Sequence, residues 1–206
     1  MKRSELVGDI SELTGESETL QLRQQDFVQM PADAYAVLWS AAGGFGDPLE
    51  RDAGKVEADV ANGDVSVAAA KSIYGVVLGD ARATVAERER RRLERIGGKP
   101  SGKKLNGTVG LRPTENLAVR GGRWSCAKCA TDLGPLRENY KAHCVRLDRP
   151  IEESNPIVGD PARFIDPRPQ FRQFCCPGCG LLVENEIAVD TVPLLVDVEL
   201  QGTPRK

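Results

Sequence analysis

The chain has 206 residues, of which 40% are hydrophobic and 28% are charged, a composition typical of a globular protein with one medium domain or two small ones. Its longest apolar runs fall far short of the roughly 18 residues that a membrane-spanning helix needs, which excludes a membrane protein. The formal net charge of −2 is spread evenly, with 17 basic and 18 acidic side chains in residues 1–122 and 11 and 12 in residues 123–206, so neither half is the basic module that nucleic-acid binding usually requires.

The first 50 residues read as strand and loop. The opening "MKRSELVGDISEL" has no apolar run behind its two basic residues, so we expect no secretory signal and a cytoplasmic location in which thiols stay reduced. The alternation in "LQLRQQDFVQM", residues 20–30, favours a strand, and "AAGGFGDP", residues 41–48, favours a turn. This turn lacks the Lys-Ser/Thr ending of a P-loop, so we interpret it as structural and not as a phosphate-binding loop.

Three helices are predicted next. Asp52 can cap a first helix that Gly63 closes, and Ser66 can cap a short second one. After an apolar strand "VVL", Thr84 and Glu87 form a capping box in front of "VAERERRRLERI". This segment contains five Arg and three Glu, which could form a phosphate-binding face. The pattern favours a solvated helix with i,i+3 and i,i+4 ion pairs instead.

The second half of the chain reads as mainly β. Residues 97–111 contain five Gly and one Pro, which marks a flexible linker between a domain of residues 1–96 and a domain of residues 112–206. Short strands are expected at "FRQF", "LLVENEIAV" and "PLLVDVEL", with a Pro-rich loop over residues 148–170 before them.

All six cysteines lie after residue 125, and four of them form two C-x2-C pairs with 46 residues between the pairs. Zn²⁺ prefers four tetrahedral sulfur or nitrogen ligands, so the expected metal ligands are Cys126, Cys129, Cys176 and Cys179. The long separation adds only about 0.8 kcal/mol of loop-closure entropy, against roughly 10 to 16 kcal/mol for zinc binding in small peptides. We therefore expect an α+β chain, in which a small helical amino-terminal segment with a Gly-rich turn precedes the linker and a mainly β, zinc-ribbon-like module.

Alternatives to this ligand set stay open. Cys175 could replace Cys176, and Cys144 or the single histidine, His143, could replace one member of the first pair. A redox dithiol is the rival chemistry, but it needs a helix after C-x-x-C, and here the strand-like "LLVENEIAV" follows. Four thiolates leave no open position on zinc for water or substrate, so the site is expected to be structural, with no catalytic residue in this chain.

Two segments resemble known families. The stretch "GGFGDPLERDAGKVEADVANGDVSVAAAKSIYGVVL", within residues 20–96, is similar to the carboxy-terminal tail of the hydantoinase B/oxoprolinase family, without the large catalytic body of that family. The elements "WSCAKC", "ENYKAH", "FRQFCCPGCGLLVENEIA" and "VPLLVDVEL", within residues 112–200, resemble the acetone carboxylase gamma subunit, including its relatives in acetophenone carboxylase-type complexes.

The second resemblance implies a small structural subunit that binds Zn²⁺ in a biotin-independent, ATP-dependent ketone carboxylase, which converts a ketone plus bicarbonate to a 3-oxo acid. The implied partners are hydantoinase A-type and hydantoinase B-type large subunits, which would hold ATP and a divalent cation. Neither nucleic acid nor a membrane is an implied partner. One alternative is an accessory subunit of an ATP-dependent hydantoinase/oxoprolinase-type cyclic amidohydrolase, although the gamma-like half favours the carboxylase. The other is a nucleic-acid-binding zinc ribbon, against which the even charge argues.

Overall fold

A computed structural model of the chain describes residues 14–18, 20, 26–31, 33–34, 44–154, 160–163 and 165–200. The chain divides into two compact units, residues 1–42 and residues 43–206. In the first unit, the Asp33 amide donates to the Met30 carbonyl (3.0 Å) and the Met30 amide donates to the Asp33 carboxylate (2.8 Å), which closes a turn. The strand expected over residues 20–30 falls partly outside the described residues.

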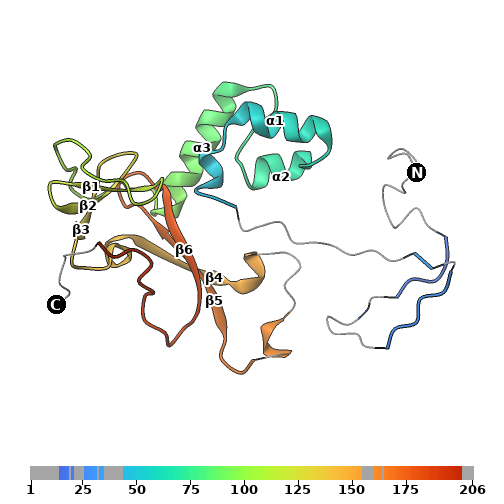
Figure 1. The fold of residues 1–206 in the computed structure, drawn as a ribbon. Coiled ribbons are helices and arrows are strands. Elements are labelled where there is room, and N and C mark those ends of the chain that lie inside the picture. The colour runs from blue at the N-terminus through green and yellow to red at the C-terminus, as the bar shows by residue number, and fades with distance from the viewer. Residues whose placement is uncertain are drawn as a thin grey trace. The chain divides into compact units, whose positions relative to one another are not determined.

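The second unit begins with three helices that lie together (Figure 1). After the 3-10 helix η3 (Pro48–Glu50) come α1 (Ala53–Asn62), α2 (Val67–Ser72) and α3 (Ala81–Arg95). Their small core consists of Val56, Ala70 and Val76, all buried. In the part of the chain that the structure describes, no helix combines the length and the apolar composition of a membrane span.

Local capping signals position the first two helices as the sequence predicts. The Asp52 carboxylate accepts from the Lys55 amide at the start of α1, and Gly63 closes that helix with a left-handed φ of 82°. The Ser66 hydroxyl accepts from the Ala69 amide at the start of α2. The structure confirms these caps. They could be predicted because each depends on residues only three or four positions apart.

The predicted start of α3 is wrong by one turn. Asp80 is the N-cap, with its carboxylate accepting from the Ala83 amide, and Thr84 lies inside the helix. The buried Thr84 hydroxyl accepts from the Val77 amide (2.9 Å) and donates to the Val77 carbonyl (3.2 Å). This side chain thus satisfies backbone groups that a strand partner would use, and "VVL" forms no strand.

The strands form two three-stranded antiparallel sheets, in the orders β1-β2-β3 and β4-β5-β6 (Figure 1). Their bounds are β1 (Leu117–Arg120), β2 (Arg123–Cys126), β3 (Asp132–Pro135), β4 (Val145–Pro150), β5 (Pro169–Cys175) and β6 (Leu182–Val189), with short 3-10 helices η4 (Tyr140–His143), η5 (Ile151–Glu153) and η6 (Pro161–Arg163). Trp124 and Tyr140 pack edge to face in the main core, with ring centroids 5.9 Å apart. The α+β fold class is confirmed.

Two of the three expected carboxy-terminal strands exist. "FRQF" lies in β5 and "LLVENEIAV" overlaps β6, but residues 193–200 form no strand, so the prediction for "PLLVDVEL" is wrong. The Leu195 carbonyl instead accepts from the side chains of Asn139 (3.0 Å) and Lys141 (3.1 Å). Hydrogen bonds from Asn139 and Lys141 therefore hold this segment in place of pairing with a neighbouring strand.

Residues 97–111 contain no helix or strand but are bound to both C-x2-C turns. The Ser101 amide donates to the Pro177 carbonyl (2.9 Å), and the Leu105 amide donates to the Ala130 carbonyl (2.8 Å). This segment therefore runs along both cysteine turns, and the domain boundaries proposed on either side of it stay a prediction.

Candidate metal centre

The first C-x2-C pair lies in a tight turn at the end of β2, which we call the first knuckle, residues 126–131. The Cys126 amide donates to the Thr131 carbonyl (2.9 Å), and the Ala130 amide donates to the Cys126 carbonyl (3.0 Å). Ala130 has a φ of 60°, a left-handed conformation that costs a residue with a Cβ about 1–2 kcal/mol. The turn that carries these two thiols therefore contains a strained residue.

The second pair lies directly after β5 in the second knuckle, residues 176–181, which repeats the same turn. The Cys176 amide donates to the Leu181 carbonyl (2.8 Å), and the Gly180 amide donates to the Cys176 carbonyl (2.8 Å). Gly180 has a φ of 68°, which glycine adopts without the penalty of Ala130. Two equivalent turns from different sheets thus present two cysteines each.

The structure brings the four expected cysteines together, with all four Sγ atoms within 4.8 Å of one another. The Cys126 and Cys179 sulfurs lie 3.8 Å apart, and those of Cys129 and Cys176 lie 3.6 Å apart. A tetrahedron with Zn–S bonds of about 2.3 Å has sulfur–sulfur edges of about 3.8 Å. The donor set and its spacing therefore fit a tetrahedral, sulfur-coordinated ion such as Zn²⁺, although the ligand assignment itself stays a prediction.

Hydrogen bonds to sulfur support this arrangement. The Thr131 hydroxyl lies 3.1 Å from Cys129 Sγ, and the Gly178 amide donates to Cys176 Sγ at 3.4 Å. Such outer contacts orient metal ligands and stabilise their thiolate form. The role of Thr131 could not be predicted from the sequence, because a threonine two residues after a cysteine is not a distinctive pattern.

The four thiols of the cluster differ in how readily they ionise. Hydrogen bonding with Cys126 raises the pKa of the Cys176 thiol and lowers the pKa of the Cys129 thiol. The sulfurs of Cys126 and Cys176 belong to fully buried residues, where like charges repel strongly. A bound divalent cation would reverse this balance and favour four thiolates at once.

The alternative ligands lie outside this group of four. Cys175 is buried beside Ile96 and Leu182, and burial raises the pKa of its thiol to about 11. Burial also raises the pKa of the Cys144 thiol to about 12, and this thiol contacts a backbone carbonyl at 3.5 Å. His143 Nε2 lies 2.8 Å from a carboxylate oxygen of Glu138.

The comparisons with known proteins cover the part of the chain that contains this candidate centre. The family model described as "Acetone carboxylase gamma subunit" matches residues 115–202, which contain both sheets and both knuckles. The acetophenone carboxylase beta subunit of Aromatoleum aromaticum (strain DSM 19018 / LMG 30748 / EbN1) is 34% identical over 95 residues, which cover 44% of this chain and 74% of that relative. The chain therefore belongs to the carboxylase-subunit family that includes this acetophenone carboxylase beta subunit.

Proposed function

We propose that this chain is the small zinc-binding structural subunit of a multisubunit, biotin-independent, ATP-dependent ketone carboxylase of the acetone or acetophenone type. The observation that carries this proposal is the family relationship over the same residues that gather four sulfurs within 4.8 Å. In such an enzyme a ketone and bicarbonate yield a 3-oxo acid. ATP and a divalent cation would belong to the partner subunits, in a cytoplasmic complex whose thiols stay reduced.

The role of the metal centre would be to cross-link the two sheets. Zinc, when bound, supplies four strong bonds between the knuckles, which contribute to folding directly. Cys126 and Cys129 hold the end of β2, and Cys176 and Cys179 hold the turn between β5 and β6. Because the four sulfurs complete a tetrahedron, they leave no position for substrate, and the proposed role is structural and not catalytic.

The proposed partners are hydantoinase A-type and hydantoinase B-type large subunits. Residues 1–96 would complete a hydantoinase B-type subunit that lacks its own carboxy-terminal tail, and the metal module would clamp an adjoining subunit. On this proposal the cognate large subunit ends near the point at which the Gly-rich turn of this chain begins. A large subunit with an intact tail of its own would contradict it.

The test is to isolate the complex through this chain, identify its subunits by mass spectrometry and measure metal per chain in the same sample. We expect large carboxylase subunits, one zinc per chain and ATP hydrolysis that depends on bicarbonate and a ketone. Hydrolysis that depends instead on a lactam would favour the cyclic amidohydrolase. A stably folded, metal-free chain that purifies alone would refute the proposal.

A matched pair of variants tests the metal assignment. Cys176→Ser removes one expected ligand. Loss of an outer hydrogen-bond partner of a ligand lowers metal affinity about 10- to 100-fold, and we expect the loss of a ligand itself to lower zinc affinity by more than that. Cys144→Ser changes a thiol outside the cluster and should leave the metal content unchanged. Equal zinc retention in both variants, measured by competition with a chromogenic chelator, would contradict the assignment.

A further inference from the structure

A buried carboxylate connects the Gly-rich turn to the second knuckle. The side chain of Asp47 has no exposed surface, and it accepts two hydrogen bonds from the Arg95 guanidinium, at 2.7 and 3.1 Å. It also accepts from the Leu182 amide at 3.0 Å, immediately after the knuckle. Burial raises the pKa of Asp47, but Arg95 and the backbone donors more than offset this and hold it below its usual value, so the group is ionised.

The backbone of the second knuckle lies directly against α3. A Cβ on Gly180 would lie 1.9 Å from the Arg92 carbonyl oxygen, so no side chain fits between them. Arg95 also donates to the Gly180 carbonyl at 3.1 Å. One arginine therefore binds both the carboxylate of the Gly-rich turn and the residue that follows Cys179.

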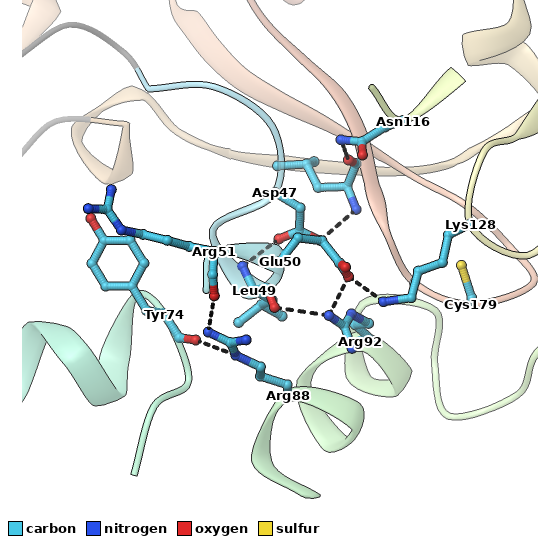
Figure 2. Close-up of polar contacts among 12 residues, drawn as sticks. Asp47, Leu49, Glu50, Arg51, Tyr74, Arg88, Arg92, Asn116, Lys128 and Cys179 are labelled. Atoms are coloured by element: carbon cyan, nitrogen blue, oxygen red, sulfur yellow. Dashed lines mark hydrogen bonds and ion pairs between the residues drawn. The ribbon is translucent and has the colours of Figure 1, made fainter. Parts of the chain in front are cut away.

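Further contacts extend this junction to the first knuckle. Figure 2 shows Glu50 with contacts to both Arg92 and Lys128, and Lys128 lies between the two cysteines of the first knuckle. At the end of α3, Ile96 packs in a buried cluster with Cys175 and Leu182. The helical segment thus contacts the first knuckle through the Glu50–Lys128 ion pair, and Ile96 packs against the residues on either side of the second knuckle.

We propose that Asp47 and Arg95 are positioning residues for the metal centre, and that metal binding and the docking of α3 stabilise each other. This inference rests on the proposed metal site. The contacts need Gly180 and Leu182 in their observed places, and the same backbone carries Cys179 into the cluster. Because coupling between two sites is reciprocal, a metal that orders the knuckle must strengthen docking, and docking must strengthen metal binding.

Hydrogen–deuterium exchange of the full chain, loaded with Zn²⁺ or stripped by a chelator, measures this coupling. We expect exchange in α3 to rise at least about tenfold when the metal is removed. Asp47→Asn should raise α3 exchange similarly with zinc still present, and should lower zinc affinity about tenfold. Asp59→Asn is the matched control, because Asp59 pairs with Arg51 among the helices and contacts neither knuckle.

A second pair of variants separates docking from backbone strain. Gly180 and Gly97 have the same φ of 68°, but a Cβ on Gly97 would meet nothing within 4 Å. Gly97 closes α3, so Gly97→Ala brings the backbone strain of a left-handed alanine to the helix without a clash. Gly180→Ala brings the same strain and also the clash with Arg92, so exchange in α3 should rise more in Gly180→Ala than in Gly97→Ala. Unchanged α3 exchange after metal removal, or in both Asp47→Asn and Gly180→Ala, would overturn the coupling.

The metal content of the unaltered chain keeps the two proposals apart. If the chain binds zinc and α3 does not respond to its removal, the coupling fails and the proposed structural metal site remains. If the chain binds no zinc, the proposed metal site itself fails, and the coupling fails with it.

Discussion

Lys141 shows how single residues fasten the end of this fold. Its side chain is 1% exposed, and its ammonium nitrogen lies 2.8 Å from Glu186, 3.3 Å from Asp197 and 3.1 Å from the Leu195 carbonyl. Arg172, fully buried, binds the other oxygen of Glu186 at 3.1 Å. Two buried cations thus pair with the buried Glu186 and the partly exposed Asp197, and these contacts hold the segment after β6 that has no strand pairing.

The first prediction concerns this network. Lys141→Met leaves the buried Glu186 without one of its two cationic partners, and we expect the free energy of unfolding to fall by about 3–5 kcal/mol. Urea denaturation followed by circular dichroism measures the loss.

Arg149→Met is the control, because Arg149 and Glu153 pair with 42% and 49% of their side chains exposed. A solvated pair of this kind contributes only about 0–1 kcal/mol. If both variants lose the same stability, the buried network does not hold the fold in the way described.

At the scale of elements, the two knuckles are the same turn built from different residues. Each has an amide at its fifth position that donates to the first cysteine carbonyl, and a left-handed residue at that position. In the second knuckle that residue is glycine, and in the first it is Ala130. The same turn therefore forms with the same hydrogen bond whether glycine or alanine occupies the left-handed position.

The second prediction follows from this difference. Ala130→Gly relieves the left-handed strain and should stabilise the chain by up to about 1 kcal/mol. Ala86→Gly, at an exposed position inside α3, should instead destabilise it by about 1 kcal/mol. Thermal melts of both variants check the opposite signs, and destabilisation by Ala130→Gly would show that the left-handed alanine carries no strain.

Element boundaries could be predicted where their causes are local. Asp52, Gly63 and Ser66 act on amides and carbonyls within a few residues, and the sequence predicts their caps correctly. The strand at "VVL" was predicted wrongly because Thr84 bonds back to Val77, seven residues away, which its own neighbours do not indicate. The start of α3 was predicted wrongly although its cap is local, because Asp80 and Thr84 can both cap a helix and the capping-box pattern favoured Thr84.

At the scale of the whole molecule, the third prediction is that thermal stability depends on zinc. A hundredfold excess of free zinc over its dissociation constant stabilises the folded state by about 2.7 kcal/mol, because the metal binds the folded chain preferentially. For a chain of this size that raises Tm by roughly 5–10 °C. Differential scanning calorimetry at buffered zinc concentrations measures the shift, and a Tm that is independent of zinc would contradict a structural metal.

The pattern of cysteines, the helix caps and the α+β class are readable from the amino-acid order because each depends on short spacings or on composition. The approach of the two knuckles, the contact of Asp47 with Leu182 across 135 positions and the burial of Lys141 against Glu186 come from packing. Contacts between distant residues depend on how whole elements fit together, and the spacing within one stretch carries no information about that fit. For this reason the candidate ligands were found from their spacing, while the residues that position them were found from the fold.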